Sequence, residues 1–189
     1  MSNFDFTTDV LDWEPWVTPV DLSTATPDQL AVLDESGPHA RTSLYYHLLL
    51  HDVPALREHS ALFNAIMYGP GGLPREDREL GATVESIFNS CVYCASVHAR
   101  SYIQLAKRPD VIDRLFVDGV GAELEPRLRA IADFSARLAE TPPHAGAAEI
   151  QALRNAGLTD SDIADLADAV AMSAWENRLV LTLGEPKRP

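Results

Sequence analysis

Two cysteines and a histidine stand at a spacing that suits redox chemistry: Cys91, Cys94 and His98. Residues three, four and seven apart lie on one face of an α-helix, so the two thiols and the imidazole would point the same way. The cysteines would also occupy the first turn, where free backbone amides and the helix dipole favour a negative charge. A thiolate should therefore form there at lower pH than in a free cysteine, and the thiolate is the reactive form.

Two carboxylates precede this segment, and both could serve the histidine. If the chain reverses direction near residues 89–90, the helices before and after that point run antiparallel. Glu79 would then lie near His98, and Glu85 would fall opposite Cys94. Either carboxylate can orient and charge the imidazole, as a third group orients the base beside a nucleophile.

Other uses of the same residue types compete with this interpretation. A Cys-x-x-Cys pair with a nearby histidine can hold zinc, which usually takes four protein ligands in a structural site. The fourth ligand would have to be Glu79, Glu85 or a distant histidine. Two buried cysteines can also serve as small core hydrophobes. Charged side chains are mostly exposed. Glu79 could therefore be a solvent-exposed helix residue instead of a functional one, and Glu85 is expected to be exposed.

The remaining histidines show no paired motif: His39, His47, His51, His59 and His144. His47 and His51 are four apart and share a helix face, which would suit a metal only with a further ligand nearby. Surface positions are therefore expected for these histidines. No metal or cofactor is expected in the protein.

The first 25 residues have the composition of an extended arm, with frequent Asp, Thr and Pro. Trp13 and Trp16 are its main apolar groups. Because exposed tryptophans are costly, the arm should lie on its own core or on a neighbouring subunit. The chain is thus divided into an arm, residues 1–25, and a helical domain, residues 26–189.

Caps, breakers and apolar periodicity divide that domain into helices. Thr26 and Thr159 are expected caps, and the Gly-Pro-Gly-Gly stretch at 69–72 ends a helix. This stretch is no phosphate loop, because no Gly-Lys-Ser/Thr follows it. No segment alternates apolar and polar residues for long enough to predict a strand. We expect an all-α fold of about eight helices, near residues 26–36, 41–51, 54–68, 74–88, 91–107, 128–138, 150–156 and 159–183.

The charge balance restricts the possible partners. Asp and Glu number 28 against 15 Lys and Arg, a net charge of −13 that would repel phosphate backbones and anionic membrane surfaces. No apolar run approaches the roughly 20 residues needed to cross a bilayer, and the start lacks a secretory signal. We expect a cytoplasmic protein that binds neither nucleic acid nor membrane. In that reducing compartment a close cysteine pair is usually redox-active or metal-binding.

The spacing of the reactive residues resembles a known family. Glu79 is followed twelve residues later by Cys91-x-x-Cys94-x-x-x-His98. This pattern resembles the alkylhydroperoxidase D-like and carboxymuconolactone decarboxylase-like superfamily, and most of all its uncharacterised peroxidase-related branch. The strong match spans residues 73–105. The resemblance implies an all-α fold of packed helices and a homo-oligomer, whether trimer, dimer or hexamer.

The resemblance also implies a cysteine peroxidase mechanism. Cys94 would be the peroxidatic thiolate, which the hydroperoxide oxidises to a sulfenic acid, and Cys91 would resolve it as a disulfide. Glu79 and His98 would form the proton relay. An external dithiol or protein reductase would then restore the thiols.

The sequence departs from the family pattern at two positions. Tyr93 stands where the better-studied peroxidases have a second histidine, and a tyrosine is no base near neutral pH. Glu85 stands where relatives commonly have an apolar residue, so it would either supplement Glu79 or raise the thiol pKa. Both are possible auxiliary residues. The decarboxylase branch lacks the cysteine pair, which disfavours lactone decarboxylation.

We therefore expect a thiol-dependent peroxidase, or oxidoreductase, that acts on a small-molecule hydroperoxide. A general thiol–disulfide oxidoreductase or a redox sensor would use the same residues without peroxide turnover. A non-enzymatic, zinc-stabilised helical scaffold is the alternative from a different class.

Overall fold

The computed structural model describes residues 5–188, which form nine α-helices, two short 3-10 helices and one two-stranded sheet. The helices are α1 (Pro27–Ser36), α2 (Leu44–Leu49), α3 (Val53–Tyr68), α4 (Arg75–Phe88), α5 (Val92–Ala106), α6 (Pro109–Asp118), α7 (Pro126–Ala139), α8 (Ala147–Asn155) and α9 (Asp160–Leu183). The 3-10 helices are η1 (Ala40–Thr42) and η2 (Gly119–Gly121). The predicted all-α fold class is confirmed.

Local capping explains where several of these helices begin. Thr26 accepts a hydrogen bond from the backbone of Gln29, whose side chain bonds back to Thr26, and Pro27 occupies the first turn of α1. Thr159 and Asp162 form the same reciprocal pair at the start of α9. Both helix starts are where the sequence predicts them.

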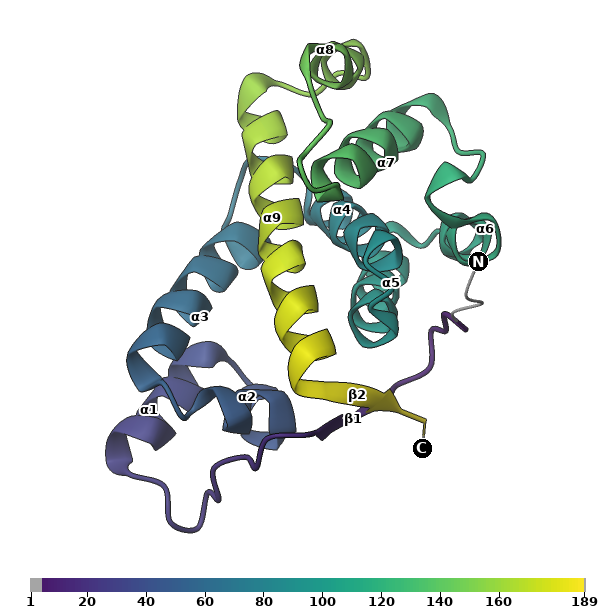
Figure 1. The fold of residues 1–189 in the computed structure, drawn as a ribbon. Coiled ribbons are helices and arrows are strands. Elements are labelled where there is room, and N and C mark those ends of the chain that lie inside the picture. The colour runs from purple at the N-terminus through teal and green to yellow at the C-terminus, as the bar shows by residue number, and fades with distance from the viewer. Residues whose placement is uncertain (1–4, 189) are drawn as a thin grey trace.

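Helix α4 lies at the centre of the molecule. It packs against α5, α7 and α9, and α9 runs between the N-terminal helices α1–α3 and the helices α4–α8 (Figure 1). Residues 77–87 of α4 are all buried, including its charged side chains. The main core gathers around Leu80 and Val84 of this helix, together with Ile112, Ile131 and Leu166. Because α4 is enclosed on several sides, its polar residues at positions 77–87 are buried together with its apolar ones.

The expected count of about eight helices is one short within the described residues, because the sequence analysis does not predict α6. The sequence marks Pro109 only as the breaker after the preceding helix. In the structure it occupies the first turn of α6, where a missing backbone N–H costs nothing. Val111, Ile112 and Leu115 bury the inner face of α6.

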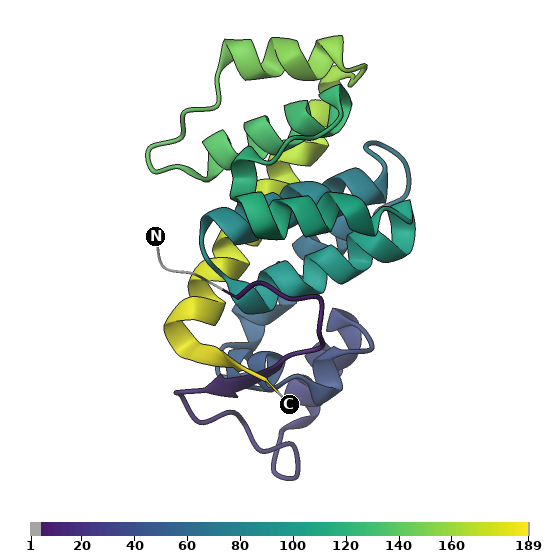
Figure 2. The ribbon, with the colours of Figure 1, turned by 90° about the vertical axis from the view of Figure 1, so that its right-hand side faces the viewer.

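The expectation that no sheet forms is also wrong, because the structure contains one small two-stranded sheet. Strands β1 (Asp12–Pro15) and β2 (Gly184–Lys187) pair antiparallel and lie side by side in both views (Figures 1 and 2). Each strand has four residues, too few to show alternation. Gly184 permits the pairing, since a Cβ there would lie 2.4 Å from the Trp13 ring.

The arm is thereby attached to the helices. Trp13 is buried and its indole N–H donates to the Val180 carbonyl at 3.2 Å, whereas Trp16 remains 62% exposed. Along the part of the chain that the structure describes, no helix has both the length and the apolar character needed to cross a membrane.

Candidate active site

The two cysteines lie together at the start of α5. Ser90 adopts a left-handed backbone conformation, with φ of 62°, and the chain reverses there between α4 and α5, as the sequence predicts. Cys91 is the N-cap of α5, and its sulfur accepts a hydrogen bond from the Cys94 backbone N–H at 3.4 Å. The two Sγ atoms are 2.6 Å apart, and both thiols are free. Cys91 is fully buried and Cys94 is 6% exposed.

The expectation of an easily formed thiolate is wrong for Cys94. Burial raises the pKa of this thiol well above its usual range, and the neighbouring Cys91 thiol and the negative charge of Glu176 act in the same direction. The helix dipole and the free amides of the first turn favour a thiolate, and both can be inferred from the sequence. The loss of solvent around the sulfur disfavours the charged form, and it follows only from the tertiary structure.

Glu79 and His98 lie in contact across the α4–α5 pair. His98 Nδ1 is 2.8 Å from Glu79 Oε2, and both side chains are buried. Arg75 donates to the other carboxylate oxygen, Oε1, at 3.1 Å and packs over the ring of Tyr68. The carboxylate thus receives a donor on each oxygen, which fixes its orientation. His98 is four residues after Cys94, one helical turn along the same face of α5.

Glu85 is fully buried, so the expectation that it is exposed is wrong. Burial raises its pKa to about 7, although Arg178 and a hydrogen bond from the Asn89 side chain, 2.5 Å from Oε1, both lower it. Its second oxygen, Oε2, has no hydrogen-bond partner within residues 5–188. No hydrogen bond in that range joins Glu85 to either cysteine sulfur.

Tyr93, between the two cysteines, is half-buried and lines a pocket of about 540 Å³ beneath the N-terminal arm. Leu11, Trp13, Pro15 and Leu44 form the apolar part of the pocket wall, and the charged side chains of Asp12, Glu14 and Lys187 also line it. Burial raises the Tyr93 pKa, and so does the charge that the Cys94 thiol can carry. The hydroxyl therefore stays protonated near neutral pH and can act only through hydrogen bonds.

Sequence reasoning missed a second buried polar group beside the cysteines. Tyr45 of α2, His59 of α3 and Glu176 of α9 meet in the interior, although the hydroxyl and the carboxylate are 131 residues apart in the chain. The expectation of a surface position is wrong for His59, which is 3% exposed. No motif links these residues, so only the packing of three distant helices could reveal them.

Among the residues described, no group of three or more His, Cys, Asp and Glu side chains could hold a metal ion. The ring Nε2–H of His51 donates to the Thr18 carbonyl at 2.8 Å, and that of His47 donates to the Arg41 carbonyl at 3.0 Å.

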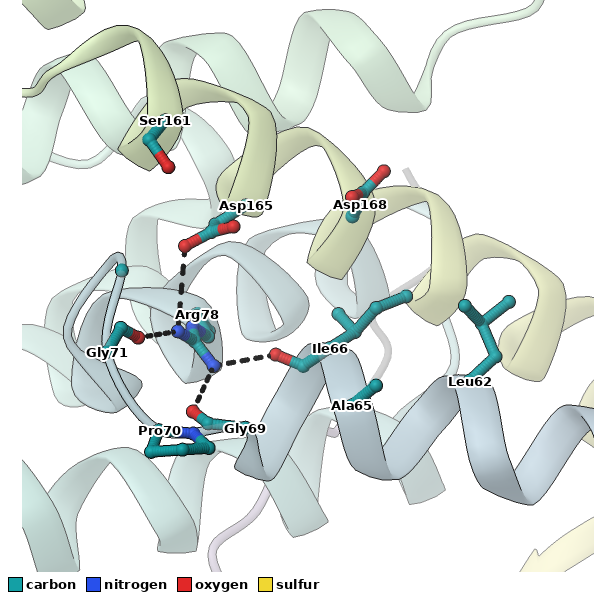
Figure 3. A pocket seen from close by; sticks show the side chains of 11 residues that line it. Leu62, Ala65, Ile66, Gly69, Pro70, Gly71, Arg78, Ser161, Asp165 and Asp168 are labelled. Atoms are coloured by element: carbon teal, nitrogen blue, oxygen red, sulfur yellow. Dashed lines mark hydrogen bonds and ion pairs between the residues drawn. The ribbon is translucent and has the colours of Figure 1, made fainter.

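A second pocket, of about 430 Å³, lies between α3, the following loop and α9 (Figure 3). Arg78 is buried at its base and donates to the carbonyls of Ile66, Gly69 and Gly71 at 2.6 to 3.2 Å. Asp165 accepts from the Leu73 backbone at 2.8 Å. These polar groups are engaged with the loop backbone, so the arrangement holds the loop in place.

Comparison with known proteins places these features in context. Residues 55–136 match the carboxymuconolactone decarboxylase family, a stretch that includes Glu79, both cysteines and His98. The solved structure of an uncharacterised peroxidase-related protein from Ralstonia eutropha JMP134, described as an alkylhydroperoxidase AhpD core, is 27% identical with a TM-score of 0.73. That similarity covers 93% of this chain and 90% of the other.

Other structures are similar over comparable lengths. An uncharacterised peroxidase-related protein from Silicibacter sp. TM1040 is 26% identical with a TM-score of 0.72, covering 93% of this chain and 94% of that one. The debrominase Bmp8 is 16% identical with a TM-score of 0.72, covering 89% of this chain and 90% of that one, and shares the fold alone. No curated protein sequence matches the chain.

Proposed function

The chain belongs to the alkylhydroperoxidase D-like and carboxymuconolactone decarboxylase-like superfamily, and from this premise we propose that it is a thiol-dependent peroxidase acting through Cys91 and Cys94. The observation that carries the proposal is the pair of free thiols with sulfurs 2.6 Å apart. A disulfide between them would need only a small further approach. A carboxylate–imidazole pair stands one helical turn away.

The reaction has two steps in this proposal. The Cys94 thiolate attacks the outer peroxide oxygen, the O–O bond breaks, the alcohol leaves with a proton, and Cys94 becomes a sulfenic acid. The Cys91 thiol then attacks that sulfur, and the disulfide forms with release of water. A dithiol or a protein reductase supplies two electrons and two protons to restore the thiols. Cys94 is assigned as the attacking thiol because it is the less buried of the two.

Glu79 and His98 are proposed as the proton relay. The high pKa of Cys94 means that a base must take its proton when the peroxide arrives. His98 can accept that proton and later give it to the leaving alcohol, while Glu79 on Nδ1 orients and stabilises the imidazolium. Arg75 holds the carboxylate in the required orientation.

Tyr93 and Glu85 are proposed in auxiliary roles. Tyr93 lines a pocket of mixed polar and apolar character, and its phenol can donate a hydrogen bond to a hydroperoxide bound there. The charge of Glu85, when this carboxyl is ionised, would influence the pKa of the thiols. We also propose a homo-oligomer, because Trp16 and Trp175 are 62% and 42% exposed.

The test is a count of free thiols before and after one equivalent of an alkyl hydroperoxide, in a metal-free buffer. We expect both thiols to disappear together in the native protein. In the Cys91→Ser protein a dimedone-reactive sulfenic acid should accumulate at Cys94. The Cys94→Ser protein should consume no peroxide, and normal turnover by this variant would refute the assignment.

The same experiment separates the related candidate functions. A thiol–disulfide oxidoreductase would keep its thiols in peroxide but lose them to a small disulfide. A redox sensor would form the disulfide once, and turnover would not follow when dithiothreitol is supplied.

A further inference from the structure

The buried group formed by Tyr45, His59 and Glu176 has a defined geometry. The Tyr45 hydroxyl donates to Glu176 Oε2 at 2.5 Å, and His59 Nε2 lies 2.5 Å from Glu176 Oε1. The three residues are only 5%, 3% and 9% exposed. His59 is further enclosed by the rings of Phe63 and Trp175. The Tyr45 hydrogen bond orients the carboxylate inside the protein, whereas the His59 imidazole makes a close contact without a hydrogen bond from either ring nitrogen within residues 5–188.

This group lies beside the redox pair, and its carboxylate comes from a different helix than Glu79. Tyr45 packs in the same apolar cluster as Cys91, Cys94 and Trp13, with the Trp13 ring edge-on at 5.6 Å. Glu176 comes from α9, whereas the Glu79 carboxylate comes from α4. The cysteines thus have a second buried carboxylate close by.

The two carboxylates differ in what surrounds them. Glu79 has the permanent positive charge of Arg75 on one oxygen and the His98 imidazole on the other. Glu176 has a neutral phenol and the His59 imidazole, and no Lys or Arg within residues 5–188 forms an ion pair with it. An uncompensated charge acts strongly on a neighbouring group where water is excluded.

We propose that Glu176, held by Tyr45 and His59, is a positioning residue that restrains the reactivity of Cys94 by keeping a negative charge beside its sulfur. This inference rests on the proposed function only in taking Cys94 as the reactive thiol. The charge opposes formation of the thiolate, so the resting thiol is protected from unselective oxidation. In agreement, the Glu176 charge contributes to the raised pKa of Cys94, after burial and the Cys91 thiol.

Other titratable groups also face this site and must be held constant in any test. They are Tyr45 and Tyr46 from α2, His59 from α3, and Cys91 and Tyr93 from α5. All of them remain when the charge of Glu176 alone is removed. Substitution by glutamine does this with little change in shape.

The experiment measures the rate at which iodoacetamide alkylates Cys94 as a function of pH, in full-length protein carrying Cys91→Ser so that one thiol remains. Glu176→Gln is the test variant. Glu58→Gln is the matched control, since it removes an equal charge from an exposed residue next to His59 on α3. Far-UV circular dichroism establishes that each variant is folded.

We expect Glu176→Gln to move the midpoint of the pH profile to lower pH and Glu58→Gln to leave it unchanged. At a pH below both midpoints, a midpoint that is lower by one pH unit should speed alkylation about three- to fourfold, because greater thiolate content outweighs the lower nucleophilicity. An unchanged midpoint in Glu176→Gln, or an equal change in the control, would overturn the proposal. A merely loosened structure would instead raise the plateau rate at high pH.

A second variant keeps the test decisive if Glu176→Gln does not fold. Tyr45→Phe removes the hydroxyl that holds the carboxylate by a hydrogen bond, so the negative charge should be less firmly positioned beside the thiol. The midpoint should move in the same direction as for Glu176→Gln, and by less. A midpoint at higher pH, or an unchanged one, would contradict the proposal. Because alkylation needs no peroxide, this result is independent of whether the peroxidase proposal holds.

Discussion

Glu85 makes the stability of the protein depend on pH in a direction that can be calculated. Its pKa is about 7 in the folded protein, against an ordinary value of 4.5. The folded state therefore holds a proton that the unfolded chain has released between these two pH values. The contribution of Glu85 to stability is therefore most favourable below pH 4.5 and becomes less favourable as the pH rises to about 7, beyond which the full cost is present. The difference between 4.5 and about 7 corresponds to about 3 kcal/mol.

Glu85→Gln should remove this cost, because the amide remains neutral at every pH. Asn89 can still donate to the amide oxygen, so the hydrogen bond at 2.5 Å has a replacement. The unpartnered Oε2 becomes an NH2 group, which carries a pH-independent penalty of about 1–3 kcal/mol if it finds no acceptor. The quantity to compare is thus the change in stability at pH 8 minus that at pH 4.5. We expect this difference to be about 3 kcal/mol in favour of the variant.

The assay is urea unfolding at the two pH values, followed by far-UV circular dichroism with a phosphine reductant to keep the thiols reduced. Glu58→Gln is the control, because an exposed carboxylate should show almost no such difference. Equal effects of Glu85→Gln at both pH values would refute the reasoning. That result would mean that the buried carboxylate finds solvent or a counter-charge in solution.

Three further predictions concern the relay, the arm and the assembly. Glu79→Gln should lower kcat/KM for an alkyl hydroperoxide by roughly 10²-fold or more with folding intact, because general acid–base assistance is lost. An unchanged kcat/KM in a coupled dithiol assay would count against the relay. Trp13→Ala should destabilise the protein by about 3–5 kcal/mol, which lowers Tm by about 6–20 °C in a thermal melt; a change below about 2 °C would show that the arm is not part of the core. Light scattering at micromolar concentration should give a multiple of the 20.7 kDa chain mass, and a monomer would contradict the oligomer proposal.

The parts of the site that were predicted are those fixed by local geometry. Helical spacing places Cys91 and Cys94 together, and a single reversal of the chain brings Glu79 to His98. The contact depends only on two adjacent helices and the turn between them. Caps at the helix starts were predictable for the same reason, since each involves residues within one turn.

The parts that were missed depend on contacts between distant segments. Glu85 lies on a helix that α5, α7 and α9 cover from several sides, and its burial follows from that enclosure rather than from any pattern in α4. The group around Glu176 joins three helices. The β1–β2 pair joins the two ends of the chain. Each needs the tertiary arrangement before its partners can be named.

Two physical effects change the pKa of the Cys94 thiol in opposite directions, and the larger of them determines its reactivity. A helix N-terminus contributes about 0.3–1 kcal/mol to an exposed negative charge, which lowers a pKa by less than about one. Full burial of an ionisable group can change its pKa by up to about 3–5. Cys94 is 6% exposed, so burial outweighs the dipole. A resting thiol of this kind reacts quickly only when a base takes its proton as the peroxide binds, and this is the role that we propose for His98.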